Sequence, residues 1–383
     1  MNDLDKIDFN KVIENESELH TYKKLSLDII KYLSINNSSS FLGILKNVGG
    51  SDRRTLRLLN ELVINNILLY NKGLFMLGKR RKIRYASRSL ICRECEGSLT
   101  DVSPLADIKS RMVSIFRNKP KPTFIFDQRP VTLDTTIKRV AYALARGDIQ
   151  DKKVAIVGDD DLTSIAISLT GVAKKVYVFD IDTRLVTFIQ KISDNLKLDI
   201  NVVEQDFTKE VPKIYKEYFD MFMTDPTPTK VPFTVVGNAC LSLVNKDKGT
   251  GYFSIYSSAM DKNLDLQTVI HKMGLLITDI IPFFTEYDFI EETYSPQDKR
   301  LLGVYGNNKN PISFTESLVR VESTKKTRPL NISYNLNELL GKATKRVIYD
   351  LSKDPGLKTK SHNEKKYLLN IARDMKEKID KGG

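Results

Sequence analysis

The chain has few residues of the kinds that bind metals or form disulfides. Its 383 residues include three cysteines and three histidines. Cys92 and Cys95 form one Cys-x-x-Cys pair, but a structural zinc site needs a second pair of ligands, and neither Cys240 nor the scattered histidines supply it. Three cysteines do not make a disulfide framework either. We therefore expect no metal site and a reducing, cytoplasmic location.

Long apolar segments are also missing. No run of about 18 apolar residues occurs, so we expect no transmembrane helix and no membrane partner. The N-terminus reads Met1-Asn2-Asp3-Leu4-Asp5, which is acidic and lacks the apolar region of a secretory signal. Hydrophobic residues make up 41% of the chain, enough for ordinary globular cores, and the length favours two or three domains.

Positive charge dominates the chain but is unevenly distributed. The formal net charge of +12 permits binding to nucleic acid or to an anionic surface. The segment from Asp148 to Asp225, however, holds 15 acidic against 10 basic residues, whereas residues 341–383 hold 12 basic against 6 acidic residues. Scattered surface charge would explain such a bias. The acids gather at the ends of predicted strands, which favours a local site for a cation.

Residues 1–85 are expected to form a winged-helix-like domain. Apolar residues recur at helical spacing in three segments, and a hairpin around Asn71-Lys72-Gly73 follows them. Basic side chains start the third helix and end the hairpin, at Arg53, Arg54, Arg57 and Lys79-Arg80-Arg81-Lys82. This pattern suits contact with a DNA backbone, but winged helices also serve as packing modules within enzymes. The sequence leaves both interpretations open.

The rest of the chain is expected to form an α/β domain at 123–340, after a connector at 86–122 that carries the Cys-x-x-Cys pair. Five short apolar strands alternate with helical segments: Lys153–Val157, Lys175–Phe179, Ile200–Val203, Met221–Thr224 and Gly251–Tyr256. This alternation predicts a doubly wound, Rossmann-like parallel sheet. A further strand and a reversed terminal pair are expected among Leu275–Pro282, Phe289–Tyr294 and Ser317–Glu322.

The last segment, residues 341–383, is expected to be a basic tail. A helix is predicted at Glu364–Lys381, after the break at Asp354-Pro355-Gly356. We expect this tail to be mobile, or to become ordered only on binding.

Four of the predicted strands end in acidic residues. The ends are Gly158-Asp159-Asp160-Asp161, Asp180, Asp206-Phe207 and Asp225-Pro226. Ligands of doubly wound sheets bind at the carboxyl ends of the strands. Asp180 follows Gly158 by 22 residues, a spacing that suits a carboxylate accepting both hydroxyls of a ribose. Asp206 is placed for an adenine amino group with Phe207 beside the base, so the pattern predicts a nucleoside site.

The turn after the first strand has one glycine and three acids. Doubly wound enzymes usually keep this turn rich in glycine so that the backbone approaches an anionic group, and a helix N-terminus attracts anions. Asp159, Asp160 and Asp161 place negative charge there instead, which repels a carboxylate or phosphate and attracts a cation. We expect Asp161 to cap the helix that starts at Leu162-Thr163-Ser164, which leaves two acids for function. Asp225 is held on a stiff turn by Pro226, although such turns are common in ordinary loops.

This order of motifs resembles that of the class I S-adenosylmethionine-dependent methyltransferases. More closely, the chain resembles the branched-chain polyamine synthases of archaea and bacteria, which are aminopropyltransferases that branch spermidine at its central nitrogen. The resemblance covers most of residues 20–335, and its most specific motif is Gly158-Asp159-Asp160-Asp161-Leu162-Thr163-Ser164. More widely shared features are the winged-helix-like front, Cys92–Cys95, Asp127-Gln128 followed by Thr135, Phe179-Asp180-Ile181-Asp182 and Thr224-Asp225-Pro226.

Two positions depart from the family pattern. The chain has Asp225-Pro226-Thr227-Pro228 where the family has Asp-Pro-Pro, and Gly97-Ser98-Leu99 where Gly-Arg-Gly is expected. The first departure leaves the acceptor specificity open, and the second bears on the connector.

The resemblance implies decarboxylated S-adenosylmethionine as co-substrate with no further cofactor, spermidine as acceptor and methylthioadenosine as product. It implies donor binding by Gly158, Asp160, Asp161, Asp180, Asp206 and Phe207, and acceptor binding by Asp159, Asp225, Tyr256 and Glu286. Both substrates are cationic, and the donor lacks the carboxylate that three acids would repel. Asp159 would accept the central N–H, directly or through water, while Asp225 holds the acceptor in line. Core packing or a surface position is the alternative for Tyr256, Glu286 and the adjacent Tyr287.

Two other functions remain open. One is an amino-directed methyltransferase acting on nucleic acid, because Asp225-Pro226-Thr227-Pro228 resembles the acidic shelf that such enzymes use. The other is a winged-helix regulator that senses a nucleoside or polyamine. Branched polyamines in this family accompany thermophily, but the sequence shows neither a growth temperature nor the number of aminopropyl groups added. It also leaves the oligomeric state open, a homodimer included.

Overall fold

The structure is a computed structural model of the 383-residue chain. It describes residues 6–13, 16–78, 100–246, 248–257, 259–288, 295–306, 312–340, 342–358 and 361–380. The chain divides into two compact units. The first comprises Met1–Leu99, Tyr256–Asn263 and Ile281–Ser317, and the second comprises Thr100–Ile255, Leu264–Ile280 and Leu318–Gly383.

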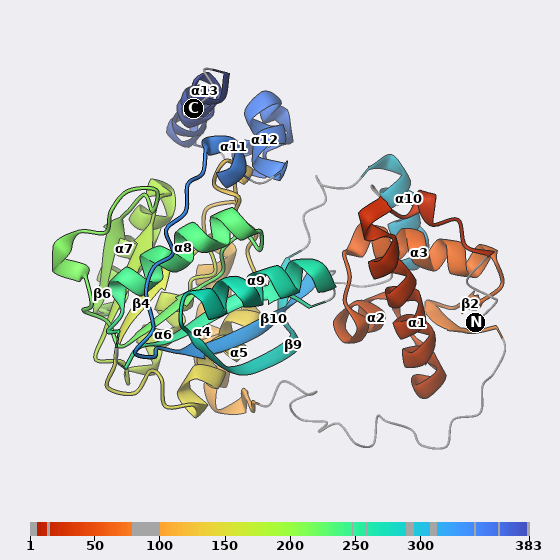
Figure 1. The fold of residues 1–383 in the computed structure, drawn as a ribbon, viewed down its shortest axis with the longest axis horizontal. Helices are drawn as coiled ribbons and strands as arrows, with labels where there is room; N and C mark the ends of the chain where they lie inside the picture. The colour runs from red at the N-terminus through yellow and green to blue at the C-terminus, as the bar shows by residue number, and fades with distance from the viewer. Residues whose placement is uncertain are drawn as a thin grey trace. The chain divides into compact units, whose positions relative to one another are not determined.

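Among its described residues, the first unit begins with two short 3₁₀ helices, three α-helices and a small sheet (Figure 1). Their bounds are η2 (Phe9–Lys11), η3 (Glu16–Glu18), α1 (Leu19–Asn36), β1 (Ser38–Ser39), α2 (Phe41–Val48), α3 (Asp52–Ile64), β2 (Leu68–Asn71) and β3 (Leu74–Leu77). The sheet order is β1-β3-β2, and both pairings are antiparallel. The three predicted helices and the hairpin are confirmed, while the assignment of this unit as a winged helix stays a prediction.

The apolar stripes of these helices form the core of the first unit. Leu25, Ile29 and Leu33 of α1 are buried against residues of α2 and α3, as their helical spacing predicts. Ser40 caps α2, its hydroxyl accepting the Gly43 N–H at 3.1 Å.

A helix from much later in the chain completes this unit. α10 (Pro296–Tyr305) packs against α3, and the Tyr305 ring lies 4.9 Å from that of Tyr70 and 5.2 Å from that of Phe75. A capping box at Ser295 and Asp298 starts the helix. The sequence analysis did not predict α10.

The second unit contains most of a seven-stranded sheet of order β6-β5-β4-β7-β8-β10-β9. The strands are β4 (Lys153–Val157), β5 (Lys175–Asp180), β6 (Ile200–Glu204), β7 (Met221–Thr224), β8 (Thr250–Tyr256), β9 (Leu276–Asp288) and β10 (Ile312–Glu322). The pairs β4–β5, β4–β7, β5–β6 and β7–β8 are parallel. The five predicted parallel strands are therefore confirmed to within one residue at each end.

The last two strands differ from the expectation in length. β9 and β10 are longer than the predicted segments, and each runs from one unit of the chain into the other. Phe289–Tyr294, the third segment expected there, lies outside the described residues.

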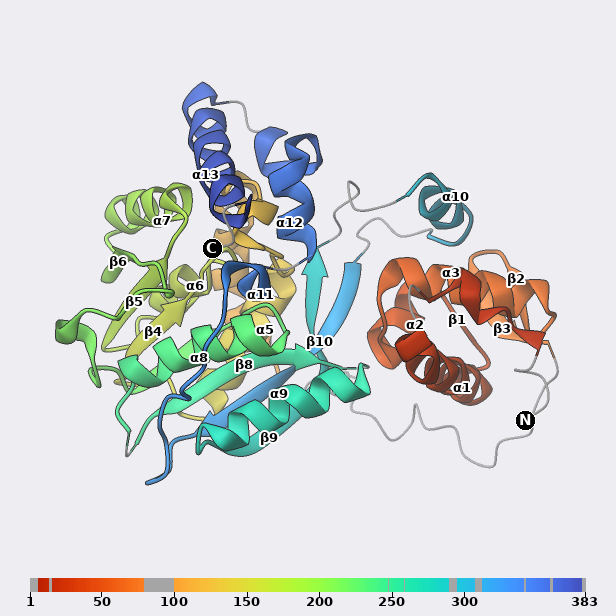
Figure 2. The same ribbon diagram turned by 45° about the horizontal axis from the view of Figure 1, so that its top comes forward.

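Helices cover both faces of the sheet (Figure 2). They are α4 (Ala106–Asn118), α5 (Leu133–Ala145), α6 (Thr163–Thr170), α7 (Thr183–Leu196), α8 (Lys230–Leu243) and α9 (Met260–Lys272). α4, α5 and α6 pack against one another, and α8 and α9 lie in front of the strands in Figure 2. The nearly continuous burial of β4, β5 and β7 is typical of a parallel sheet covered on both faces.

The C-terminal segment is folded into further helices of the second unit. They are α11 (Leu336–Leu339), α12 (Lys342–Tyr349), η9 (Leu351–Lys353), η10 (Pro355–Lys358) and α13 (His362–Asp380). The predicted tail helix is confirmed as α13. The buried Asp354 accepts hydrogen bonds from the Thr123 hydroxyl (2.5 Å) and the Phe124 N–H (3.3 Å), which ties this segment to η6 (Phe124–Phe126). Mobility of the tail stays a prediction.

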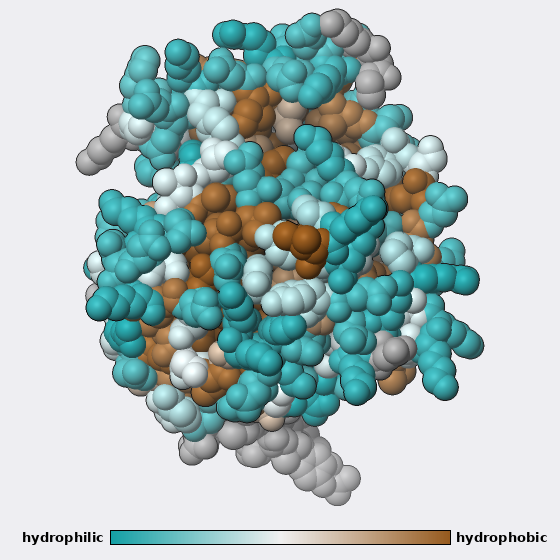
Figure 3. Space-filling view, turned by 90° about the vertical axis from the view of Figure 1, so that its left-hand side faces the viewer, coloured by the Kyte–Doolittle hydropathy of each residue, from teal (hydrophilic) through white to brown (hydrophobic). Residues whose placement is uncertain are grey.

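The surface of the α7 and β6 side carries mostly polar and charged side chains with apolar areas between them (Figure 3). No helix among the described residues is both long and apolar enough to cross a bilayer. Within those residues no group of three His, Cys, Asp or Glu side chains is placed to hold a metal. Cys92 and Cys95 lie outside the described residues, and Cys240 is buried.

Candidate active site

The predicted acids lie at the carboxyl ends of neighbouring strands. In the register of the sheet, Val157 of β4 is opposite Phe179 of β5 and Thr224 of β7. Parallel strands end at the same edge, so the residues that end β5 and those that follow β4 and β7 come together there. These residues are Gly158-Asp159-Asp160-Asp161, Asp180 and Asp225.

The turn after β4 is shaped by two residues with positive φ. Gly158 has φ +74°, and its N–H donates to the carbonyl of Phe179 at 2.9 Å. Leu162 has φ +56° and occupies the N-cap position of α6 without a side-chain cap bond. Glycine adopts positive φ freely, and a leucine there needs support from its surroundings. The side chain of Leu162 is fully buried, which supplies that support.

Asp159 caps α6, so the expectation that Asp161 does so is wrong. The Asp159 carboxylate accepts the backbone N–H of Ser164 at 3.3 Å and also accepts the Ser164 hydroxyl. The left-handed Leu162 adds a turn before the helix, and this brings Asp159 rather than Asp161 to its first N–H groups. Asp159 is fully buried (0% exposed), and burial raises the pKa of its carboxyl to about 8, against the lowering effect of Ser164.

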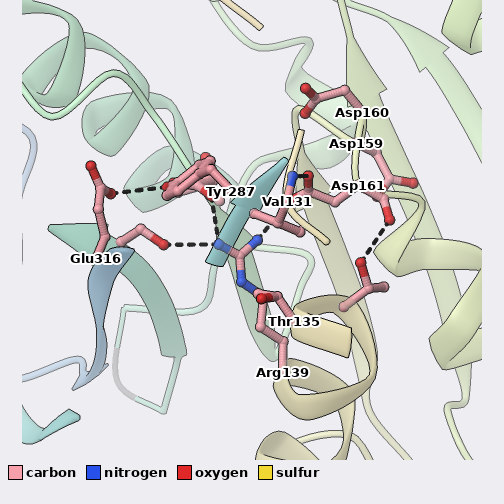
Figure 4. Close-up of polar contacts among 12 residues, drawn as sticks. Val131, Thr135, Arg139, Asp159, Asp160, Asp161, Tyr287 and Glu316 are labelled. Carbon is pink, nitrogen blue, oxygen red and sulfur yellow. Dashed lines mark hydrogen bonds and ion pairs between the residues drawn. The ribbon is translucent and has the colours of Figure 1, made fainter. Parts of the chain in front are cut away.

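Asp161 and Asp225 are joined by a buried arginine. Asp161 accepts the Val131 N–H at 3.0 Å through Oδ1 and Nη1 of Arg139 at 2.6 Å through Oδ2. Nη2 of the same guanidinium donates to Asp225 Oδ2 at 2.5 Å and to Ser254 Oγ at 2.9 Å. Figure 4 shows this chain from Val131 through Asp161 to Arg139. The guanidinium neutralises both carboxylates, and burial still raises the pKa of Asp161.

Sequence reasoning missed Arg139. It lies on α5, among buried residues such as Ile137 and Val140, and only 3% of its side chain is exposed. The sequence did hold a signal for it, because Arg139 is a single cation on the apolar face of the helix that precedes the first strand. Buried arginines need acidic partners, and acids at the strand ends supply them.

Asp160 differs from its neighbours because one of its carboxylate oxygens is buried without a partner. Oδ2 accepts no hydrogen bond from the described residues, while the backbone carbonyl of Asp160 accepts Nζ of Lys119 at 2.7 Å. Burial raises the pKa of this carboxyl well above its usual range, and the charge of Asp161 adds to the effect. Figure 4 shows the Asp160 carboxylate directed away from those of Asp159 and Asp161. A buried, unpaired acceptor is a place for a cationic donor.

Asp180 is built into the same turn. Its Oδ2 accepts the Asp159 N–H at 2.9 Å and its Oδ1 accepts the Asp182 N–H at 2.8 Å. Burial raises the pKa of Asp180 to about 6. Each oxygen keeps a further lone pair for a ligand hydroxyl. Between the two acids, Ile181 is 37% exposed, an apolar side chain that the sequence analysis did not single out.

Asp206 and Phe207 lie after β6. Asp206 Oδ1 accepts the Thr208 N–H at 2.9 Å and the Thr208 hydroxyl at 2.7 Å. The half-buried ring of Phe207 lies 6.4 Å from that of Phe179, the residue of β5 that precedes Asp180. Their roles toward an adenine stay predictions.

Tyr256 and Glu286 belong to the first unit, whereas the acids at the strand ends belong to the second. Their role in binding the acceptor therefore stays a prediction. Tyr256 ends β8 and is half-buried. Glu286 lies on β9, where it pairs with Lys46 at 2.9 Å. The adjacent Tyr287 donates its hydroxyl to Glu316 at 2.9 Å.

Two of the arginines expected at a DNA backbone make ion pairs within the first unit. Arg54 pairs with Glu18 at 2.6 Å, and Arg57 donates to both oxygens of Asp298 at 2.7 and 2.8 Å. Carboxylate partners reduce the charge these side chains present to a phosphate. The basic run Lys79-Arg80-Arg81-Lys82 lies outside the described residues.

Comparison with known proteins identifies relatives over more than half of the chain. The chain is 36% identical over 209 residues to N(4)-bis(aminopropyl)spermidine synthase of Thermococcus kodakarensis, over 53% of this chain and 60% of that protein. It is 34% identical over 250 residues to the protein of the same name from Methanocaldococcus jannaschii, over 63% of this chain and 70% of that protein. The chain thus spans about three fifths of the length of the Thermococcus relative it matches.

A solved structure shares the fold. The branched-chain polyamine synthase from Thermus thermophilus, crystallised in complex with N4-aminopropylspermidine and 5'-methylthioadenosine, superposes with a TM-score of 0.62 at 21% sequence identity. The match covers 84% of this chain and 97% of that chain.

The model of the branched-chain polyamine synthase A C-terminal domain matches residues 107–342, more than half of the chain. The chain belongs to the branched-chain polyamine synthase family.

Proposed function

We propose that the protein transfers an aminopropyl group from decarboxylated S-adenosylmethionine to the central nitrogen of spermidine, giving a branched polyamine and methylthioadenosine. The observation that carries this proposal is the acid cluster Asp159-Asp160-Asp161, in which Asp159 and Asp161 are buried and Asp160 is half-buried. It lies at the turn where related nucleotide folds receive an anion. The two relatives from Thermococcus kodakarensis and Methanocaldococcus jannaschii support the same reaction, since both carry the name N(4)-bis(aminopropyl)spermidine synthase.

The adenosine part of the donor binds along the ends of β4, β5 and β6. Asp180 accepts the ribose hydroxyls with the lone pairs that its backbone partners leave open. Ile181, 37% exposed beside it, offers an apolar surface to the adenine. Asp206 and Phe207 take the amino group and the ring, and Gly158 leaves open space at the turn, where a Cβ would meet no atom within 4 Å.

The aminopropyl end of the donor is an ammonium, and Asp160 is its partner. Oδ2 of Asp160 is buried without a hydrogen bond, so an ammonium there gains a charge-assisted bond and relieves the buried acceptor. Intact S-adenosylmethionine would bring a carboxylate to the same acids. Two like charges 4 Å apart repel by about 4 kcal/mol at an effective dielectric constant of 20, which corresponds to about a 10³-fold loss of affinity.

Transfer requires a neutral central nitrogen. Its lone pair attacks the methylene group next to the sulfonium, the C–S bond breaks, and the bonding electrons stay on sulfur as methylthioadenosine leaves. The proton released from the central nitrogen passes to Asp159, directly or through a water. A carboxylate with a pKa of about 8 is a far better proton acceptor near neutral pH than an ordinary aspartate.

The acceptor is held by acids on the β7 side. Asp225 lies on the Pro226 shelf with its Oδ2 fixed by Arg139, so its other oxygen is presented in a defined direction. Tyr256 and Glu286 are further candidates for the acceptor wall. Positioning of two cations in one water-poor pocket supplies much of the rate.

A product assay tests the function. Purified protein is mixed with spermidine and either decarboxylated or intact S-adenosylmethionine, and methylthioadenosine, S-adenosylhomocysteine and the polyamines are quantified. We expect methylthioadenosine and a branched polyamine from the decarboxylated donor alone. The transfer rate of the Asp159→Asn variant should fall by about 10²-fold or more. Asp199→Asn is its control, because it removes the charge of an exposed aspartate just before β6.

The same samples address the number of groups added, the alternative reaction and the oligomeric state. The mass of the polyamine product reports whether one or two aminopropyl groups are added. S-adenosylhomocysteine formed with a nucleic acid acceptor would instead support the amino-methyltransferase alternative. Light scattering of the same sample tests whether the protein is a homodimer.

A further inference from the structure

The segment before α5 lies across the ends of three strands. The Val131 N–H donates to Asp161 after β4 at 3.0 Å, and Gln128 Nε2 donates to Asp182 after β5 at 2.9 Å. Asp127 accepts the hydroxyl of Thr227 after β7, with 2.5 Å between Thr227 Oγ1 and Asp127 Oδ2. Residues 127–131 therefore line the edge at which the acids gather.

The Asp127–Thr227 bond depends on a hydroxyl that lies between two prolines. Thr227 lies between Pro226 and Pro228, and of these three residues it alone has a hydroxyl to donate. Asp127 itself has φ +54°, a left-handed conformation that aspartate adopts more readily than most residues. The Asp127 N–H donates to the Phe124 carbonyl at 3.1 Å, which fixes the backbone of this turn.

Asp127 differs in charge balance from Asp161 and Asp225. Asp225 and Asp161 each pair with the Arg139 guanidinium, so their negative charge is met within the protein. Asp127 is half-buried, and among the described residues its carboxylate makes no ion pair within 4.0 Å. Burial raises the pKa of Asp127, and the Thr227 bond, the Arg129 charge and the nearby Thr344 hydroxyl oppose this rise. A bound cation would favour the ionised form.

We propose that Asp127 is a further acceptor-binding residue that takes a terminal ammonium of the polyamine, and that Thr227 is the positioning residue that directs it. Thr227 follows Asp225 by two residues, so their Cα atoms are at most about 7 Å apart. In this proposal Asp225 and Asp127 contact one acceptor at two different nitrogens, and the Asp127–Thr227 bond joins the two acids through one short segment of chain. This inference rests on the proposed function, because it names a contact within the same site.

The test pairs a change in the protein with a change in the acceptor. Spermidine is compared with N-butyl-1,3-diaminopropane, which lacks one terminal ammonium, and with its isomer N-propyl-1,4-diaminobutane, which lacks the other. Equilibrium binding is measured by calorimetry in the presence of methylthioadenosine, so it needs no turnover. For wild-type protein, loss of the ammonium that meets Asp127 should weaken binding by about 10- to 100-fold.

Asp127→Asn should weaken spermidine binding by a similar factor and bind that truncated acceptor as wild-type protein does. Thr227→Val should weaken spermidine binding by about 3- to 10-fold, and Thr227→Ser should restore it, because serine keeps the hydroxyl. Thr229→Val is the matched control, since Thr229 is exposed two residues further on and makes no side-chain cap bond. In steady-state assays the acceptor KM should rise in Asp127→Asn while the donor KM stays unchanged.

Equal losses for wild-type and Asp127→Asn protein with both truncated acceptors would overturn the inference. So would a Thr227→Val protein that binds spermidine as tightly as wild type. A protein that binds spermidine in this Asp127-dependent way but releases no methylthioadenosine would keep the inference and reject the proposed reaction. Thermal melts of each variant confirm that the comparison is made on folded protein.

Discussion

The Asp159 carboxylate accepts both the hydroxyl and the backbone N–H of Ser164, and in this way a fully buried acid is held at the start of α6. Burial raises its pKa to about 8, and the two bonds from Ser164 act in the opposite direction. The same side chain thus caps a helix and is proposed to accept a proton. Its titration therefore links catalysis, stability and pH.

The pH dependence of transfer should report Asp159. The rate under kcat/KM conditions is expected to rise with pH, with an inflection near pH 8, and to level off above it, where the carboxylate is the main form. Ser164→Ala removes a bond that lowers this pKa, so its inflection should move upward by about one pH unit. Ser168→Ala on the same helix serves as the control. An unchanged inflection in Ser164→Ala would assign the titration to another group.

Asp159→Asn should make the protein more stable at high pH. The folded-state pKa of about 8 lies above the value of an unfolded aspartate, about 3.9, so the folded protein binds more protons between these values. Stability from this group is complete below about pH 4 and is lost as pH rises through 8. Melting temperatures should be similar at pH 4, and the variant should melt about 2 °C or more higher at pH 9. If the variant melted lower than wild type at pH 9, the ionised Asp159 carboxylate would be stabilising the folded protein, and the expected sign would be wrong.

Arg139→Met should strongly destabilise the second unit. It leaves Asp161 and Asp225 buried without their cation, and breaking a buried ion pair in this way costs about 3–5 kcal/mol. Arg146→Met, at the end of the same helix and 42% exposed, should cost less than about 1 kcal/mol. Denaturant unfolding measures both. Adding Asp161→Asn to Arg139→Met should recover part of the loss, and a loss below about 1 kcal/mol for Arg139→Met alone would refute the bridging role.

Asp160→Asn should weaken donor binding without affecting the nucleoside. Methylthioadenosine lacks the aminopropyl ammonium, so wild type and variant should bind it equally. Decarboxylated S-adenosylmethionine should bind about 10- to 100-fold more weakly to the variant, because the charge-assisted bond to Oδ2 is lost. Calorimetry with both ligands, with Asp199→Asn as the exposed control, gives the comparison. A parallel loss for both ligands would mean that Asp160 supports the turn rather than the ammonium.

The parallel sheet and its acidic edge could be predicted because the information is local. Short apolar strands at regular spacing define β4 to β8, and parallel strands necessarily end on one edge, which brings Asp180 and Asp225 toward Asp159-Asp160-Asp161. The family motif added the identity of the substrates.

What the sequence did not reveal depends on long-range contacts and on one unusual backbone angle. The cap of α6 was assigned to Asp161 because the left-handed Leu162, a rare conformation for leucine, was not anticipated. Arg139 and Asp225 are separated by 86 residues, and no local pattern joins them. The packing of α10 on α3, including the Arg57–Asp298 pair, was not predictable for the same reason, since the two helices are far apart in the sequence.

The central claim, that the acid cluster has replaced an anion site with a cation site, is tested most directly by comparing two donors on wild-type protein. Calorimetry with decarboxylated and with intact S-adenosylmethionine isolates the effect of one carboxylate. We expect the decarboxylated donor to bind about 10³-fold more tightly. Equal or tighter binding of the intact donor would contradict the account.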